Sequence, residues 1–345
     1  MSLYSEDRDV LAESIRHFYL RRVIAPMLRA LGPARSERIA RRLAAGIADL
    51  QTPSRAVAEA RIREALGRAA DPAEVRRICR GMYDNIARFW AEALFVPRRL
   101  GEAGWRRYVN VNGEDRLETV ARSGRGCLLA TAYFGNPAAA AVALGQIFRP
   151  VHVVADFLAQ PQLRAWQREL YAMPTIRVIE RRAAGVAIPK ILETGGAVFL
   201  ICEQERLGGP ATNVPFLGRT VRCYPTLDRL AKWFNVPTVA VACHRNDVPL
   251  SFTLDVAGIV DGECEDGEVT RRTMAALEAA ILRRPEQYLW SIPAATQQAP
   301  GVIDTGSASA SCPRRSRTAT VMQMPSAAGR PRGDSAAGVE PVPTG

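Results

Sequence analysis

Three segments of the chain place polar side chains after apolar runs that are typical of buried strands. Residues 132–137 (Ala-Tyr-Phe-Gly-Asn-Pro) follow the apolar run 126–131, and residues 203–206 (Glu-Gln-Glu-Arg) follow the run 197–202. Residues 214–219 (Val-Pro-Phe-Leu-Gly-Arg) come a little later. In an open parallel sheet the ligand crevice lies beyond the carboxyl ends of the strands. We therefore expect these three segments to carry the chemistry.

The first segment offers a phenol beside two small residues. Gly135 and Asn136 would let backbone N–H groups approach a ligand, which makes both candidate substrate-binding residues. Tyr133 is a candidate catalytic residue because its hydroxyl could donate a hydrogen bond to a substrate carbonyl; the alternative is that it only fills space. A phenol with an ordinary pKa of about 10 is a poor base at neutral pH.

The second segment offers a carboxylate that could serve as a base. Glu203 would do so if burial raised its pKa, and the alternative is a solvated acidic turn. Gln204 and Arg206 are candidate substrate-binding residues in the same loop.

Arginines near these segments are candidate anion-binding residues. Arg181, Arg182 and Arg219 could bind an anionic group such as a phosphate through charge-assisted hydrogen bonds. The alternative is that they are surface residues in a chain rich in arginine.

Histidine and cysteine offer little further chemistry. The three histidines are His17 in an expected N-terminal helix, His152 at a strand start and His244 after a strand. His244 is the best placed as a catalytic base, and a strand-end histidine without that role is the alternative. The seven cysteines form no CxxC pair and no zinc-type spacing, so we expect a reduced compartment, no structural metal and no cofactor.

Alternating strands and helices must position these residues. Strands are expected at residues 108–111, 126–131, 151–154, 175–179, 197–202, 238–242 and 250–256. Helices are expected at residues 114–121, 138–148, 162–171, 186–193, 225–234 and 269–284, with a loop at 203–223. This alternation predicts an α/β fold with a mainly parallel central sheet flanked by helices.

The N-terminal part is predicted to be helical. Between residues 9 and 60, apolar residues recur at helical spacing among arginines, a pattern that suits either a membrane surface or packing against the rest of the protein. Asp71 and Pro72 are expected to start a further helix that runs to Pro97. The predicted organisation is a helical region at 1–100, an α/β domain at 101–293 and a disordered tail at 294–345.

Net charge and hydropathy indicate the chemical class of the binding partners and the cellular location of the protein. The 345 residues carry a net charge of +11, which favours anionic partners such as lipid head groups or an acidic protein. Nucleic acid is not expected, because the arginines are spread over helix faces. The first ten residues lack an apolar segment, so we expect no secretory signal and a cytoplasmic location. The uncharged stretch 126–148 is broken by Gly135-Asn136-Pro137 and is expected to be buried core.

Four stretches in order resemble the bacterial lipid A acyltransferases of the lauroyl and myristoyl transferase type, within the wider lysophospholipid acyltransferase group. That family shows a His-Phe-Gly-Asn-Trp-Glu segment, an Asp-Gln turn, a Val-Pro-Phe-Phe-Gly segment and Pro-Glu-Gln-Trp-Leu-Trp. The corresponding stretches, within a resemblance that spans roughly residues 61 to 290, are 133–138, 203–204, 214–219 and 285–290.

The resemblance implies acyl transfer from acyl carrier protein or coenzyme A to a hydroxyl of a lipid or glycolipid. It also implies a peripheral location on the cytoplasmic face of the inner membrane, where a basic surface suits both the acidic carrier and the anionic lipid.

The chain departs from the family at the catalytic pair. In the family motif a histidine takes the proton of the attacking hydroxyl and an acid five positions on orients it. Tyr133 and Ala138 occupy these two places. Asp156 stands where the family usually has an arginine, and Ser291-Ile292-Pro293 replaces a basic and aromatic ending.

Three hypotheses follow from this departure. The first is an acyltransferase-like protein with weakened or lost catalysis. The second is a non-catalytic protein that binds a lipid or an acyl carrier and supports a partner enzyme. The third is an active transferase whose base is Glu203 or His244.

Overall fold

The computed structural model describes residues 20–49, 52–67, 69–101, 104–156, 164, 167–169, 171–206 and 208–291. These all fall within one compact unit, Met1–Gly306. His17, the predicted tail 294–345 and most of the predicted helix 162–171 lie outside the described residues.

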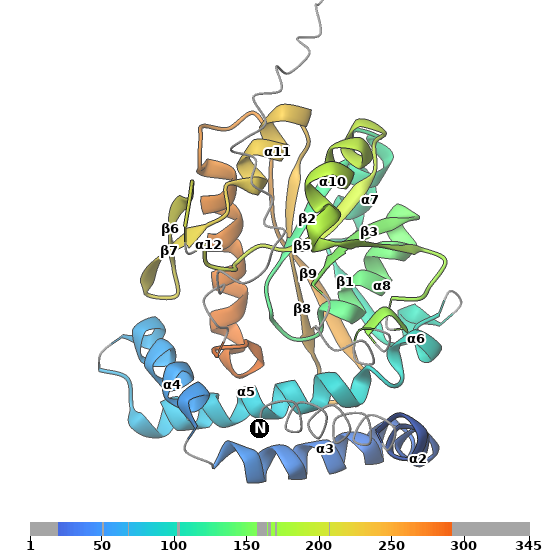
Figure 1. The fold of residues 1–345 in the computed structure, drawn as a ribbon, viewed down its shortest axis with the longest axis vertical. Helices are drawn as coiled ribbons and strands as arrows, with labels where there is room; N and C mark the ends of the chain where they lie inside the picture. The colour runs from blue at the N-terminus through green and yellow to red at the C-terminus, as the bar shows by residue number, and fades with distance from the viewer. Residues whose placement is uncertain are drawn as a thin grey trace, which may run out of the picture. The chain divides into compact units, whose positions relative to one another are not determined.

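A seven-stranded sheet forms the centre of the fold (Figure 1). Its strands follow the spatial order β1-β9-β8-β2-β5-β3-β4, and only the β8–β9 pair is antiparallel. Their bounds are β1 Val109–Asn112, β2 Cys127–Thr131, β3 Val151–Ala155, β4 Ile176–Glu180, β5 Ala197–Ile201, β8 Thr238–Arg245 and β9 Phe252–Val260. The predicted α/β fold with a mainly parallel sheet is confirmed.

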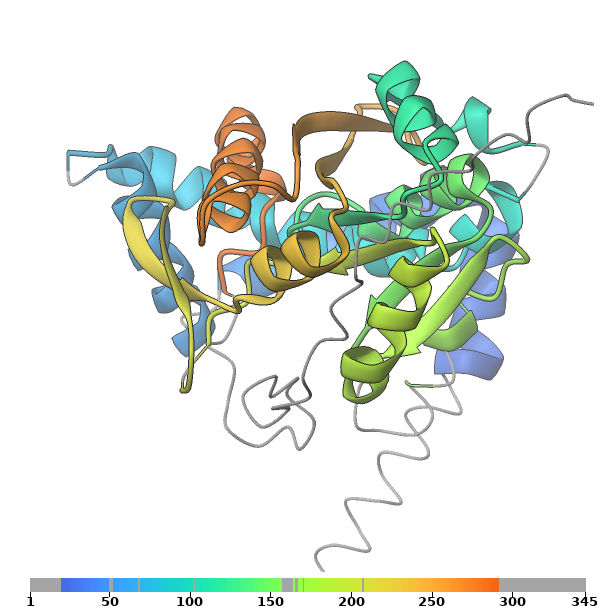
Figure 2. The same cartoon turned by 90° about the horizontal axis from the view of Figure 1, so that it is seen from above.

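Helices cover both faces of this sheet (Figures 1 and 2). Because side chains alternate along a strand, Leu129 of β2 packs in the core shared with α8, whereas Leu128 and Ala130 pack in the core shared with α10 and α11. The bounds are α7 Glu114–Arg122, α8 Pro137–Phe148, α10 Ala184–Glu193, α11 Thr226–Phe234 and α12 Glu268–Arg283, with short 3-10 turns η2 Trp105–Arg107, η3 Arg181–Ala183 and η4 Pro285–Gln287.

The stretch 126–148 forms β2 and the alanine-rich α8, both buried, which confirms the prediction of buried core. In the part of the chain that the structure describes, no helix combines the length and apolar character that crossing a membrane requires.

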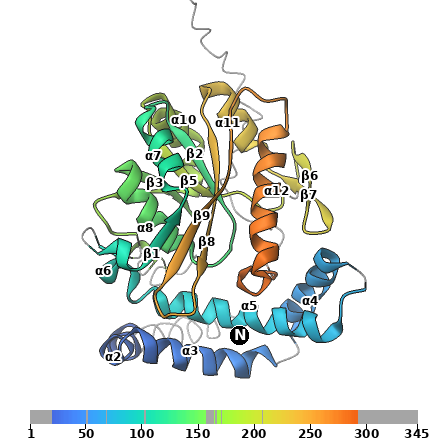
Figure 3. The same ribbon diagram turned by 180° about the vertical axis from the view of Figure 1, so that it is seen from behind.

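An N-terminal helical region packs against one end of the sheet. Its elements are η1 Leu20–Ile24, α2 Ala25–Leu31, α3 Pro33–Ala48, α4 Pro53–Leu66, α5 Pro72–Glu92 and α6 Val96–Arg99. As predicted, Asp71 caps α5 by accepting from the backbone N–H of Ala73 at 2.9 Å, with Pro72 in the first turn. Figures 1 and 3 show α5 between α3 and the sheet.

The predicted loop 203–223 is wrong in its second half, which forms an antiparallel hairpin beside α12 (Figure 1). Its strands are β6 Thr212–Phe216 and β7 Arg219–Cys223. Leu217 and Gly218 make the two-residue turn with φ angles of 50° and 78°, as a type I′ turn requires. Pro215 is compatible with this hairpin, because proline is tolerated in an edge strand.

Candidate functional site

The carboxyl ends of β2 and β5 bring two of the predicted segments together. The two strands pair in parallel with Thr131 opposite Ile201, so the residues that follow them leave the sheet side by side. The backbone N–H of Tyr133 donates to Oε1 of Glu203 at 2.6 Å. The expectation that strand ends gather the polar residues therefore holds for Tyr133 and Glu203.

Glu203 is a buried carboxyl group with one oxygen unused. Glu203 is 5% exposed, and its Oε2 atom makes no hydrogen bond within the described structure. Burial raises the pKa of Glu203 to about 7, although the hydrogen bond from the backbone of Tyr133 opposes this. Near neutral pH the carboxyl group is therefore divided between its acid and base forms.

Apolar and weakly polar side chains surround Glu203. The pKa values of the Cys202 and Cys223 thiols and of the Tyr288 phenol are raised. Burial is the larger cause, and the nearby negative charge of Glu203 is the second. The two thiols and this phenol consequently stay protonated and cannot themselves serve as bases.

The hydrogen bonds of the neighbouring side chains determine whether the Tyr133 hydroxyl accepts or donates toward Gln204. Arg181 donates from its guanidinium to Oε1 of Gln204, and arginine has no acceptor. The Gln204 amide nitrogen therefore faces Tyr133 and donates to its hydroxyl oxygen at 3.0 Å. Because that oxygen accepts from Gln204, the phenolic proton is left to point elsewhere.

The phenol of Tyr133 keeps its proton. Burial, and then the charge of Glu203, raise the pKa of Tyr133 to about 12. Tyr133 is thus a hydrogen-bond donor throughout the neutral range, and its backbone N–H contacts a carboxyl group that can accept a proton.

Two arginines flank an aromatic ring beside these residues. The guanidinium carbons of Arg181 and Arg206 lie 5.6 Å and 5.1 Å from the ring centroid of Tyr224, within the range of cation–π contacts. Arg181 also lies 3.5 Å from the carboxylate of Asp156. Tyr224 was not predicted as a site residue, because nothing in its local sequence marks it.

The other two candidate arginines make ion pairs. Arg219 pairs with Glu205 at 3.2 Å at the start of β7, close to the Glu203 loop. Arg182 lies on the surface and pairs with Glu180 at 2.7 Å. Arg181 rather than Arg182 therefore contacts the strand-end cluster.

Gly135 and Asn136 are engaged by the protein itself. Gly135 has a φ angle of +56°, and a Cβ atom there would lie 1.9 Å from the carbonyl oxygen of Cys243. The Asn136 side chain caps α8 by accepting from the backbone N–H of Ala139 at 3.0 Å and donates to Glu92 at 2.7 Å. Both residues fix the turn that carries Tyr133, and their contact with a ligand stays a prediction.

A buried polar network holds this turn against α5 and η4. Arg245 at the end of β8 makes an ion pair with Glu92 at 2.7 Å, and its guanidinium also donates to Asn85. The side chain of Gln287 bonds both backbone groups of Arg245, at 2.8 Å and 3.0 Å. The Glu92–Arg245 pair could not be predicted from the sequence, because 153 positions separate the partners.

The two described histidines lie outside the hydrogen-bonded cluster of Tyr133, Glu203 and Gln204. Nδ1 of His244 lies 3.3 Å from Asp255. Burial opposes ionisation of Asp255, but hydrogen bonds from His244 and Asn112 bring its pKa below the ordinary value. Nδ1 of His152 lies 3.3 Å from the carbonyl oxygen of Ala197. Burial lowers the pKa of the His152 ring.

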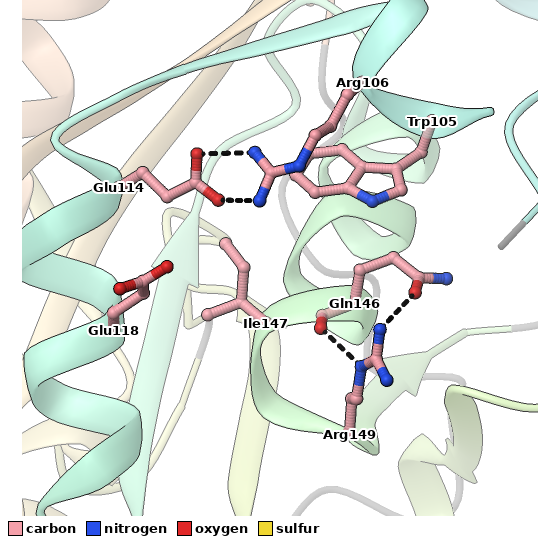
Figure 4. A pocket seen from close by; sticks show the side chains of 7 residues that line it. All are labelled: Trp105, Arg106, Glu114, Glu118, Gln146, Ile147 and Arg149. Atoms are coloured by element: carbon pink, nitrogen blue, oxygen red, sulfur yellow. Dashed lines mark hydrogen bonds and ion pairs between the residues drawn. The ribbon is translucent and has the colours of Figure 1, made fainter. Parts of the chain in front are cut away.

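A pocket of about 470 Å³ opens elsewhere, between η2, α7 and α8 (Figure 4). Arg106 lies over the ring of Trp105 and pairs with both carboxylate oxygens of Glu114 at 2.6 Å and 2.7 Å. Arg149 donates to the backbone oxygen of Gln146 at 2.9 Å. We place the site at the strand ends instead, because Oε2 of Glu203 there is buried and makes no hydrogen bond within the described structure. The described residues include no cluster of three or more metal-binding side chains.

A comparison with protein families gives one match over most of the chain. The sequence model for the bacterial lipid A biosynthesis acyltransferases matches residues 5–293. No curated protein matches the chain. The matched range includes the strand-end segments, the hairpin and η4, so the resemblance drawn from the four motifs is confirmed. The chain belongs to the bacterial lipid A biosynthesis acyltransferase family.

Proposed function

We propose that this protein transfers an acyl chain from acyl carrier protein or coenzyme A to a hydroxyl group of a lipid or glycolipid. The proposal places it at the cytoplasmic face of the inner membrane, with catalysis weaker than a histidine and acid pair would give. The observation that carries the proposal is the buried Oε2 of Glu203, which makes no hydrogen bond within the described structure, while Oε1 of the same carboxyl group accepts from the backbone N–H of Tyr133.

In the proposed reaction, Glu203 is the base. The acceptor hydroxyl gives its proton to Oε2 of Glu203 as its oxygen attacks the carbonyl carbon of the thioester. The hydroxyl of Tyr133 donates to the carbonyl oxygen as negative charge develops there. When the carbon–sulfur bond breaks, the leaving thiolate takes the proton from Glu203, and the carboxylate is regenerated.

Two physical reasons make this arrangement slower than a histidine and acid pair. A carboxylate that accepts a proton becomes neutral, whereas a histidine becomes a cation that stabilises the developing oxyanion. Ala138 stands at the place of the orienting acid, and an alanine side chain cannot hydrogen-bond to a base.

The arginines near the cluster suit the anionic parts of both substrates. We assign Arg181, Arg206 and Arg219 to the phosphate of a phosphopantetheine arm or of a lipid head group, because guanidinium groups bind phosphate with two parallel hydrogen bonds. Arg182 is exposed and would meet the carrier protein instead. The net charge of +11 favours approach of the acidic carrier.

The test is acyl transfer by the purified protein from labelled acyl carrier protein to total membrane lipid. We expect slow transfer that Glu203→Gln reduces by about a hundredfold or more, the usual size of general-base catalysis. Tyr133→Phe, which removes one donor to the developing oxyanion, should also reduce it by about a hundredfold. Glu193→Gln, which changes an exposed glutamate on α10, is the matched control and should leave transfer unchanged.

The second candidate function is a non-catalytic partner protein that binds a lipid or an acyl carrier. The replacement of both members of the catalytic pair, at Tyr133 and Ala138, favours it. Binding of the carrier or the lipid without any transfer would establish this function and refute the first. Transfer that survives Glu203→Gln at the wild-type rate would place the base elsewhere.

A further inference from the structure

The exposed apolar side chains of the described residues are concentrated in the N-terminal helices. Seven of the twelve large ones lie between residues 20 and 66. They are Val23, Ile24, Met27, Leu43, Ile47, Val57 and Leu66. Single exposed apolar residues are ordinary, but such a concentration marks a surface that contacts something else.

Helix α3 carries the most exposed of the seven. Leu43 is 66% exposed and Ile47, one turn further on, is 51% exposed. Arg35 and Arg42 are exposed on the neighbouring line of the same helix, two turns apart. The outer surface of α3 therefore combines an apolar edge with a basic edge.

The only acid of α3 is turned away from this surface. Glu37 is buried and makes an ion pair with Arg88 of α5 at 3.0 Å. Ala44 and Ala48 are buried with it, so the inner face of α3 packs on α5, which lies between α3 and the sheet (Figures 1 and 3). The outer surface of α3 therefore carries only positive formal charges, because every charged residue of α3 other than Glu37 is an arginine.

We propose that the outer face of α3, defined here as Arg35, Arg42, Leu43 and Ile47, binds the surface of a bilayer that contains anionic lipids. A helix with an apolar edge beside arginines lies in the interface, with the apolar side chains among the acyl chains and the arginines at the head groups. Each arginine near an anionic surface strengthens binding about fivefold. This proposal deepens the peripheral location given above and rests on it.

The same charges argue against a second copy of the chain as the occupant. A symmetric dimer through this face would bring the arginines of two copies together, and the face holds no acid to pair with them.

The experiment is co-sedimentation of the full-length protein with lipid vesicles. One set contains phosphatidylglycerol and phosphatidylethanolamine, and the other contains only phosphatidylcholine. The apolar variant is Leu43→Gln with Ile47→Gln, because glutamine keeps the helix propensity. The basic variant is Arg35→Gln with Arg42→Gln. The matched control is Val186→Gln with Val248→Gln, which removes two apolar side chains that are 69% and 64% exposed, one on α10 and one in the turn between β8 and β9.

The wild type and the control should bind the anionic vesicles and bind phosphatidylcholine much less, with binding that weakens in high salt. The apolar variant should bind at least about tenfold more weakly to anionic vesicles. The basic variant should do the same and should lose most of the salt dependence. Circular dichroism and the elution volume of each variant report whether folding or the oligomeric state has changed.

Three results would overturn the proposal. Wild-type binding by the apolar variant would place the membrane contact on another surface and leave the peripheral location standing. Failure of the wild type to bind any vesicle would refute the peripheral location as well, and transfer to detergent-dispersed lipid would then show whether the proposed chemistry survives. A dimeric wild type that becomes monomeric in the apolar variant would assign the face to a second copy.

Discussion

Replacing Glu203 by glutamine should change how the stability of the protein depends on pH. In the unfolded chain Glu203 ionises near the ordinary value of 4.5, and in the folded protein its pKa is raised to about 7. Between these two values the folded protein holds a proton that the unfolded chain has released. The free energy of unfolding must therefore fall as pH rises through this window.

The size of the effect follows from the two pKa values. The stability that Glu203 provides in its protonated form is complete below about pH 4.5 and is lost as pH rises through about 7. The loss amounts to about 3 kcal/mol in full. Glutamine stays neutral and can still accept the backbone hydrogen bond of Tyr133, so the variant lacks this loss.

Urea unfolding between about pH 5 and about pH 8 measures this difference. Because other groups titrate in both proteins, the informative quantity is the stability of Glu203→Gln minus that of the wild type. We expect this difference to grow with pH by about 2 to 3 kcal/mol, in favour of the variant. Glu193→Gln should follow the wild type at every pH. A difference for Glu203→Gln that stays constant with pH would refute a raised pKa.

The remaining predictions concern the residues that hold the site. Gly135→Ala should cost about 2 kcal/mol or more in thermal unfolding, because a Cβ atom meets the backbone of β8 and the φ angle is positive. Arg245→Met should cost about 3 to 5 kcal/mol because it leaves Glu92 buried without its partner, and adding Glu92→Leu should restore part of the loss. Gln204→Glu should draw the phenolic proton of Tyr133 toward the new carboxylate, which lowers kcat by about tenfold with little change in KM. If kcat is unchanged, Gln204 does not orient this hydroxyl.

The strand-end part of the site could be predicted from the sequence because it depends on local signals. Tyr133 and Glu203 each follow an apolar run, and parallel strands end at the same edge. Which arginine reaches this edge could not be predicted. Arg181 and Arg182 are neighbours in sequence, and only the geometry of η3 directs the first toward Gln204.

The buried pair of Glu92 and Arg245 is a different case. In the sequence, Glu92 is only a polar residue at the end of an amphipathic helix, and Arg245 is only the last residue of a strand. Long-range pairing brings them together, and composition or periodicity carries no signal for it. The hairpin of β6 and β7 was not predicted; its turn is Leu217-Gly218, which is not one of the dipeptides, such as Asn-Gly, that mark a type I′ turn in a sequence.

The pH profile of acyl transfer tests the central claim most directly. If Glu203 is the base, kcat/KM of the wild type should rise with pH through about 7 and level off above it, since the carboxylate is the active form. Glu203→Gln should lack this rise and retain only a low, pH-independent rate. A flat wild-type profile, or a rise through about 7 that persists in Glu203→Gln, would contradict the claim that the base has moved to Glu203.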